Sequence, residues 1–370
     1  MVDAVMTLAM FPYITKYAFN RVKRWQRTVK IPCNYPLTSK LITMITQEIT
    51  ERHRTELLSL RTARLNKNEL CAVDSTSIST FGDTLADIRW GLNKEHLPLE
   101  QINSAVVYTL SSHLPVYYRT FPGNMPDSRS LDVILNDLDN SGFKDIAIIT
   151  DRGYESLKNI EKYILDGRSM SMSVKVDQKF ITDVIKTFGT FDFCPEEMTI
   201  DPETELAFYQ KKLDYELKTF EGKKVKAENF RLNLYLNVKK RTNILLKLHI
   251  ELERQKQELT QLLNKKTLLE NIFIPNDDES EDIKPQEKDI KKRYGNFYIY
   301  FYPQTKMMKS FEVNQKAVDK DKLLAGFIAN VTNNLNFTPL EALHHYKLQN
   351  EQEKYFEQMN DQMGADCLEC

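Results

Sequence analysis

Between residues 68 and 176 the sequence alternates apolar runs with helical patterns, and this alternation constrains the fold more than any other feature. Runs typical of strands occur at 70–79, 102–110, 114–121, 144–151 and 169–176, and helical patterns occur at 128–139 and 155–165. Only residues 111–113 separate the second and third runs, which predicts a β-hairpin. The order β-β-β-α-β-α-β predicts an α/β sheet in which an antiparallel meander precedes strands that enter through helical crossovers.

A basic segment precedes this region. Residues 1–66 contain 11 Lys and Arg against 4 Asp and Glu, a net charge of +7. Residues 16–30 contain six of the basic side chains, no acid and three aromatic residues. The six are Lys16, Arg21, Lys23, Arg24, Arg27 and Lys30. A basic helix or arm here suits contact with DNA phosphates, and a solvated helix face with Trp25 in a core fits equally well. Apolar residues near helical period predict one helix over 38–65.

The composition of the whole chain excludes several classes of protein. The 51 Lys and Arg nearly balance the 52 Asp and Glu, so any affinity for a polyanion has to come from a local cluster. No two of the 11 glycines form a G-x-G arrangement, which removes the dinucleotide fingerprint and the P-loop. We therefore expect no nucleotide cofactor.

The cysteines and the apolar runs indicate the compartment. The five cysteines are odd in number and scattered, with one C-x-x-C at the C-terminal end that we expect to be a frayed tail. No apolar run approaches the roughly 18 residues that span a bilayer. The N-terminal stretch lacks a cationic region before its apolar part, so we do not expect a signal peptide. The prediction is a cytoplasmic protein without membrane contact.

The alternation stops after residue 180. Leu245, Leu248, Leu252, Gln255, Leu259 and Leu262 follow a heptad spacing, which predicts a long helix that packs on its own domain. A strand is expected at 294–302, and a capping box with proline at the first helical position, residues 338–341, opens a helix to about residue 359. We predict a helical N-terminal region at 1–66, one α/β domain in two parts at 67–180 and 310–370, and an insertion at 181–309.

Two acidic residues occupy positions where ligands bind in α/β proteins. Asp74 lies within the first strand, where a carboxylate is costly unless it is satisfied, and Asp151 ends the apolar strand at 144–151. Hydrogen bonds from Ser75 and its neighbours, or capping of the next helix by Asp151, explain the two acids equally well. A pair of divalent ions needs a third acid, and the last helix offers Glu353 or Glu351.

Six blocks of the chain resemble bacterial DDE transposases of the insertion-sequence-four group. They are DSTSIS at 74–79, GLNKEH at 91–96, PVYYRTFPGNMPD at 115–127, TDRGYES at 150–156, AGFIANVTN at 325–333 and YKLQNEQEKYF at 346–356. The resemblance implies a ribonuclease-H-like mixed sheet with flanking helices, interrupted by an insertion before the last catalytic helix. In the family signature on that helix, Tyr346 and Glu353 match, whereas Gln349 replaces an arginine and Asn360 a lysine.

The resemblance implies a metal-dependent transposase. It gives Asp74, Asp151 and Glu353 as catalytic residues and as ligands of two Mg²⁺, with Mn²⁺ as a substitute. Arg152, Tyr346 and Lys354 are expected to contact DNA together with the basic N-terminal residues. The implied partners are the double-stranded terminal repeats, the target DNA and a second copy of the chain. Relatives usually continue beyond the last catalytic helix, so we expect a truncated copy. An inactive DNA-binding remnant and a ribonuclease-H-like nuclease are the alternatives.

Overall fold

The computed structural model describes residues 1–15, 17–66, 69–80, 87–91, 99–112, 114–143, 146–213, 215–218, 224–227, 230–269, 272, 290, 292–334, 336–348 and 367–368. The chain divides into two compact units. Unit 1 comprises Met1–Val174, Lys211–Leu232 and Asn330–Cys370, and unit 2 comprises Lys175–Gln210 and Asn233–Ala329. The chain therefore leaves unit 1 and returns to it twice.

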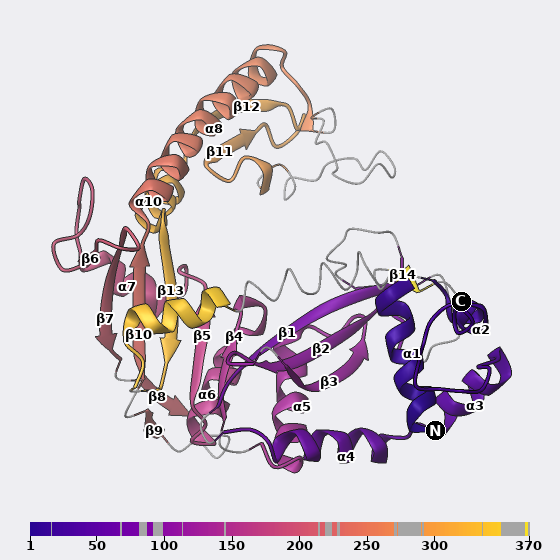
Figure 1. The fold of residues 1–370 in the computed structure, drawn as a ribbon. Helices are drawn as coiled ribbons and strands as arrows, with labels where there is room; N and C mark the ends of the chain where they lie inside the picture. Colours follow the sequence, from indigo (N-terminus) through magenta and orange to yellow (C-terminus); the bar gives the residue numbers. More distant parts are fainter. Residues whose placement is uncertain are drawn as a thin grey trace. The chain divides into compact units, whose positions relative to one another are not determined.

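The N-terminal region of unit 1 is helical, as predicted (Figure 1). Its elements are α1 (Val2–Thr15), η1 (Phe19–Arg21), α2 (Val22–Trp25), α3 (Ser39–Glu48) and α4 (Glu51–Thr62). A small core fills the space between α1, α2 and α3, and its members are Ala4, Leu8, Phe11, Val22, Cys33, Leu37, Ile42 and Ile45. Trp25 packs against this core with its ring centroid 5.2 Å from that of Phe11. This aromatic residue of the basic segment is therefore structural.

The single helix predicted over residues 38–65 is wrong, because α3 and α4 are separate helices. Ile49 ends α3 with an extended backbone. Thr50 then caps α4, and the ring of His53 accepts a hydrogen bond from the Thr50 backbone N–H at 3.1 Å. This cap satisfies backbone groups that a continuous helix would have paired internally. The spacing of the apolar residues does not reveal that the helix is interrupted between α3 and α4.

The sheet of unit 1 confirms the predicted order of elements. Its first strands are β1 (Glu69–Thr80), β2 (Gln101–Thr109), β3 (Pro115–Pro122), β4 (Ile146–Thr150) and β5 (Met170–Val174), in the spatial order β3-β2-β1-β4-β5. Strands β1, β2 and β3 are antiparallel neighbours, whereas β4 is parallel to both β1 and β5. The mixed sheet has flanking helices α5 (Asp127–Asn140) and α6 (Leu157–Leu165) and a short turn η2 (Arg152–Tyr154). The α/β fold class is thus as predicted.

Later parts of the chain complete unit 1. Residues 330–332 of β13 (Phe327–Thr332) lie beside β5, where the Thr332 hydroxyl donates to the Met170 carbonyl at 2.6 Å. Strands β8 (Tyr215–Lys218) and β9 (Lys224–Ala227) form a separate antiparallel pair. The expected frayed tail is wrong in part, because β14 (Cys367–Leu368) pairs with Ser79 and Thr80 of β1.

Unit 2 contains the long helix that the heptad pattern predicted. Helix α8 (Val238–Asn264) packs along one side of the hairpin formed by β11 (Phe297–Phe301) and β12 (Met308–Val313), as Figure 1 shows. Leu259 is fully buried there, and Leu252 and Leu262 pack against the same core. The other elements of the unit are α7 (Lys179–Lys186), β6 (Thr199–Asp201), α10 (Gln315–Leu324) and parts of β7 (Leu206–Lys212) and β10 (Arg231–Leu236). The heptad residues of α8 therefore pack into the core of unit 2.

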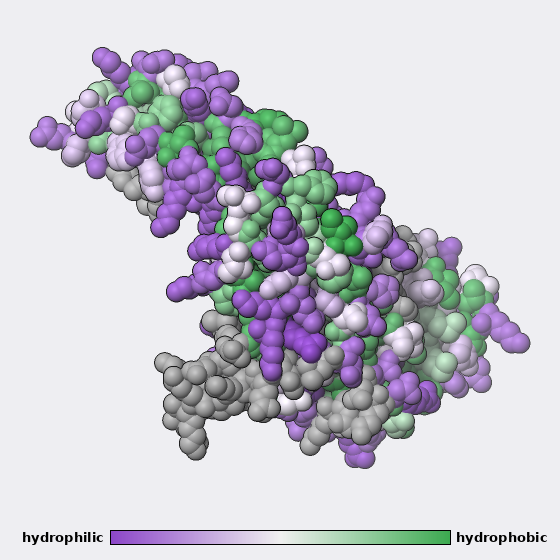
Figure 2. All heavy atoms as spheres, turned by 90° about the vertical axis from the view of Figure 1, so that its left-hand side faces the viewer, coloured by the Kyte–Doolittle hydropathy of each residue, from purple (hydrophilic) through white to green (hydrophobic). Residues whose placement is uncertain are grey.

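The surface mixes polar and apolar residues. On the face drawn in Figure 2, hydrophilic side chains are interspersed with patches of hydrophobic ones. Within the described ranges, no helix combines the length and the hydrophobicity that crossing a membrane requires.

Candidate active site

Two carboxylates lie on neighbouring strands of unit 1. In the parallel pairing of β1 with β4, Ala72 lies opposite Ile149 and Val73 opposite Thr150. Continuing this register by one residue puts Asp74 opposite Asp151, which directly follows β4. Adjacent strands are about 4.8 Å apart, and side chains two residues apart share a face of the sheet. Asp74 and Asp151 therefore lie side by side on the face that carries Ala72 and Ile149.

The two carboxylates are half-buried and differ in their contacts. The backbone N–H of Ser75 donates to Asp74 Oδ1 at 2.7 Å. Asp151 occupies the position before the turn η2 but makes no side-chain capping bond to it. The Tyr346 hydroxyl instead donates to Asp151 Oδ1 at 3.1 Å. The capping explanation for Asp151 is therefore wrong, because its carboxylate is bonded by Tyr346 and not by the turn that follows it.

A helix at residues 339–348 packs on the same face of the sheet. It begins with the predicted capping box, in which the Glu341 carboxylate accepts a hydrogen bond from the Thr338 N–H at 2.8 Å and the Thr338 hydroxyl accepts one from the Glu341 N–H at 3.2 Å. Leu348 packs against a cluster that contains Ala72 and Ile149. The helix thus brings Tyr346 to Asp151. Burial, followed by the nearby Asp151 carboxylate, raises the pKa of Tyr346, so its phenol stays protonated and can donate.

The remaining predicted residues of the site differ in their placement. Glu353 and Lys354, together with the alternative acid Glu351, lie outside the described residues, as does Lys16. Arg152 is exposed and directly follows Asp151. Among the described residues no group of three His, Cys, Asp or Glu side chains could hold a metal ion. Two adjacent carboxylates with hard oxygen donors nevertheless fit part of a Mg²⁺ or Mn²⁺ site.

The predicted basic residues of the N-terminal region are solvent-exposed. Arg21, Lys23, Arg24, Arg27 and Lys30 all have exposed side chains. The Arg21 guanidinium lies 5.0 Å from the centre of the Tyr17 ring, a cation–π contact. None of the five forms an ion pair with an acid in the described ranges. The segment therefore combines an apolar side that packs in the core, with Val22 buried and Trp25 partly buried, and an exposed cationic side.

A further acid, Asp127, lies beside the residue that follows Asp74 and was missed from the sequence. Asp127, in the first turn of α5, accepts a hydrogen bond from the Ser75 hydroxyl at 2.7 Å. It lines a cavity of about 370 Å³ together with Ser75, Thr76, Ser77, Asn103, Gly123, Asn124, Met125, Pro126 and Gly153. Burial, followed by the charge of Asp127, raises the pKa of the enclosed Tyr154. Asp127 follows a proline in the first turn of a helix, where an acid commonly stabilises the helix. The sequence therefore gives no sign of any other role for it.

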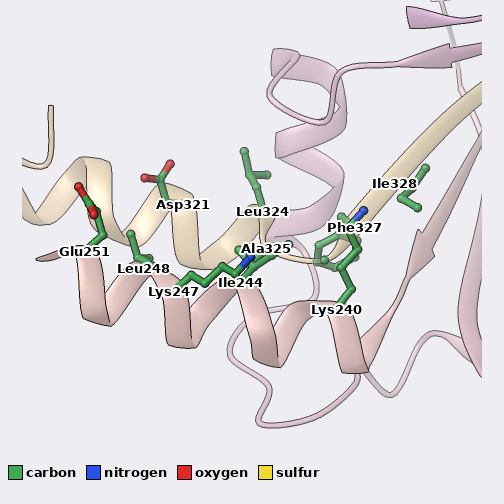
Figure 3. Close-up of a pocket in the computed structure, with 11 residues that line it drawn as sticks. Lys240, Ile244, Lys247, Leu248, Glu251, Asp321, Leu324, Ala325, Phe327 and Ile328 are labelled. Atoms are coloured by element: carbon green, nitrogen blue, oxygen red, sulfur yellow. The ribbon is translucent and has the colours of Figure 1, made fainter. Parts of the chain in front are cut away.

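A larger cavity lies in unit 2, between α8 and α10 (Figure 3). Its volume is about 530 Å³, and Ile244, Leu248 and Phe327 supply apolar walls. Figure 3 shows Lys240 and Lys247 on α8, and the cavity is also lined by Glu251 and Asp321. The charged residues that line this cavity are of both signs, so the lining singles out neither a metal ion nor a phosphate as a ligand.

The chain resembles known proteins over most of its length. A family model described as "Transposase DDE domain" matches residues 66–368. Among solved structures, the piggyBac transposase synaptic complex with hairpin DNA is 11% identical with a TM-score of 0.35, covering 60% of this chain and 51% of that chain. The Drosophila P element transposase strand transfer complex is 16% identical with a TM-score of 0.25, covering 45% and 36%.

A further solved structure, the Mos1 transposase paired-end complex with left transposon end, is 11% identical with a TM-score of 0.21, covering 45% of this chain and 57% of that chain. The chain therefore spans about half the length of the piggyBac and Mos1 chains that it matches. No curated protein matches the sequence.

Proposed function

Since the chain belongs to the Transposase DDE domain family, we propose that it is a bacterial insertion-sequence transposase of the insertion-sequence-four group. It cuts DNA at the ends of its element and joins those ends to a target by phosphoryl transfer. Two copies act together on the paired ends. The proposed insertion at 181–309 separates the two parts of the catalytic domain.

One observation carries this proposal. The parallel register of β1 and β4 aligns Asp74 with Asp151 on the face that the helix at 339–348 covers. Tyr346 on that helix donates to Asp151. In a helix that continues, Glu353 follows Tyr346 by seven residues, which is about two turns and returns to nearly the same side. This arrangement supports Asp74, Asp151 and Glu353 as the catalytic carboxylates.

Each residue has a distinct part in the proposed reaction. Asp74, Asp151 and Glu353 hold two Mg²⁺, or Mn²⁺ in its place. When bound, these ions supply activation of a water or a DNA 3′-hydroxyl and stabilisation of the leaving oxygen. Tyr346 orients the Asp151 carboxylate through its hydrogen bond and contacts the end nucleotide. Arg152 and Lys354 bind phosphate beside the reacting bond.

The basic N-terminal side chains bind the DNA outside the site of cleavage. Lys16, Arg21, Lys23, Arg24 and Arg27 provide sequence-independent attraction to the phosphate backbone. Val22 and Trp25 pack in the folded N-terminal core, so the basic residues beside them are held by that core when they bind DNA.

The test uses labelled DNA with the inverted repeats that flank the reading frame, and Mg²⁺. We expect both cut ends and joined target products from the parent chain. Asp74→Asn and Asp151→Asn are expected to lower cleavage by about two orders of magnitude or more while end binding persists, because a ligand charge is lost and shape is kept. Asp183→Asn, an exposed aspartate on α7, is the matched control with parent-like activity.

Two outcomes contradict the proposal. Cleavage without joining indicates a ribonuclease-H-like nuclease. End binding without cleavage in either Mg²⁺ or Mn²⁺ indicates an inactive DNA-binding remnant.

A further inference from the structure

Ser75 contacts Asp74 through its backbone and Asp127 through its side chain. Successive residues of β1 point to opposite faces, so Ser75 lies away from the face of Asp74. Its hydroxyl donates to Asp127 Oδ1 at 2.7 Å, and its backbone N–H donates to Asp74 Oδ1 at 2.7 Å. The residue whose N–H contacts Asp74 is therefore also the residue whose hydroxyl donates to Asp127.

The same carboxylate borders the turn after Asp151. A Cβ atom added at Gly153 would lie 3.0 Å from Asp127 Oδ2, so the glycine leaves the space that this oxygen needs. The buried Asn159 side chain joins the two segments a second time, because its Nδ2 donates to the Ser128 carbonyl at 2.9 Å and to the Tyr154 carbonyl at 2.8 Å. The start of α5 is thus held against the turn that follows Asp151.

Helix α5 is a rigid support for these contacts. Its apolar side is fully buried through Leu131, Ile134, Leu135 and Leu138. The Ser130 hydroxyl donates to the Asp127 carbonyl at 2.9 Å, which fixes the first turn. The helix N-terminus also favours a negative charge at Asp127. Its carboxylate therefore has a defined place between β1 and the turn that follows β4.

We propose that Asp127 is a positioning residue that holds Asp74 and Asp151 in register for metal binding, one carboxylate oxygen acting through Ser75 and the other against Gly153. This inference rests on the proposed function, because it assumes that Asp74 and Asp151 bind the ions. Asp127 itself lies on the opposite face of β1 and is not a ligand. A partner that orients a metal ligand typically contributes substantially to affinity for the metal.

The test measures Mn²⁺ binding to the full chain by electron paramagnetic resonance, without DNA. We expect Asp127→Ala and Ser75→Ala each to weaken Mn²⁺ binding by roughly tenfold. The double variant is expected to be no weaker than Asp127→Ala alone, since Asp127→Ala already removes the link through Ser75. Asp127→Asn keeps an oxygen that accepts from Ser75, so we expect it to restore binding to within about threefold of the parent.

Controls separate positioning from general damage. Asp132→Ala on the same helix removes ion pairs to Lys158 and Lys162 and is expected to bind Mn²⁺ like the parent. Parent-like binding by Asp127→Ala, while Asp74→Asn loses binding, would overturn the positioning role alone. Parent-like binding by Asp74→Asn would overturn the metal site, and the positioning role with it. If Asp127→Ala does not fold, Ser75→Ala and Asp127→Asn decide in the same way.

Discussion

At the residue scale, the Asp151 carboxylate is bonded by a distant segment of the chain and not by the turn that follows it. Asp151 stands where an aspartate commonly caps a helix, yet it makes no capping bond and receives the Tyr346 hydroxyl from a helix 195 residues further along the chain. Sequence patterns identify such an acid as a candidate. They do not tell capping from catalysis, because that choice depends on a partner brought in by the fold.

The Tyr346 hydroxyl offers a direct test of this contact. Tyr346→Phe removes one hydrogen bond, worth about 1 kcal/mol, so we expect Mg²⁺-dependent cleavage to fall several-fold without being abolished. The pKa of Tyr346 is raised, so the phenol stays protonated at neutral and mildly alkaline pH. The ratio of parent to variant rates is therefore expected to stay constant from neutral to mildly alkaline pH. A ratio that changes within this range of the measured pH profile would contradict this role.

At the element scale, the helix at residues 339–348 begins with a clear sequence signal. Its capping box could be predicted because three residue types at fixed spacing define it. Asp127 could not be singled out in the same way, because an acid in a first helical turn is ordinary and only the fold brings Ser75 to it. The break at Ile49 and Thr50 was missed for a similar reason, since His53 is an unusual partner in a cap.

The proposed catalytic role of Glu353 predicts a difference between two acids that follow the described part of the last helix. Tyr346 contacts Asp151. Two residues on a helix differ by about 200° and seven by about two full turns, so in a helix that continued past residue 348, Glu353 and not Glu351 would share the side of Tyr346. We expect Glu353→Gln to abolish cleavage and Glu351→Gln to be tolerated, measured as cleavage rates on labelled ends. The reverse pattern would show that the helix register is mistaken.

The basic N-terminal element predicts a salt effect. Lys23, Arg24, Arg27 and Lys30 are exposed, and replacing all four with Gln is expected to reduce the slope of log K against log salt for DNA by up to roughly 3.6 units, about 0.9 for each phosphate that is no longer neutralised. Because Val22 and Trp25 are kept, the N-terminal core is expected to stay folded. Binding measured at a series of salt concentrations, from low to physiological, checks the slope.

A control for this effect replaces Lys256 and Lys265 with Gln in unit 2, where both are exposed on or next to α8. The slope of the control is expected to match the parent. An unchanged slope in the N-terminal variant would assign DNA recognition to another part of the chain.

At the scale of the whole molecule, the order of strands and helices was predictable and the division of the chain was less so. Local periodicity describes β1 to β5 well, because each contains a short apolar stretch or an alternation of apolar and polar residues. The return of residues 211–232 to unit 1 depends on contacts between distant segments, which periodicity does not encode. The long helix α8 was predicted from its heptads, since its buried leucines face one core.

The buried tyrosines predict how the fold responds to alkaline pH. Burial raises the pKa of Tyr117, Tyr154, Tyr163 and Tyr235 above the ordinary value of 10.0, and it raises the pKa of the Cys71 thiol to about 12. Above the ordinary pKa the unfolded chain releases these protons while the folded chain keeps them. The contribution of these groups to stability is therefore complete below about pH 9 and falls as pH rises, first through Cys71 and above about pH 10 through the tyrosines, by about 1.4 kcal/mol per pH unit for each group.

The variant Tyr163→Phe isolates one such group. The Tyr163 hydroxyl is buried and has no hydrogen-bond partner among the described residues, so phenylalanine keeps the ring packing and removes both the titration and the desolvation cost of the hydroxyl. The desolvation cost does not depend on pH, so the difference in stability between variant and parent in urea unfolding at about pH 8 is the reference. At about pH 11 this difference is expected to be larger by about 1.4 kcal/mol in favour of the variant, because the unfolded parent is stabilised by ionising this tyrosine and the unfolded variant is not. A parallel loss of stability in both proteins between about pH 10 and 11 would show that Tyr163 ionises without unfolding.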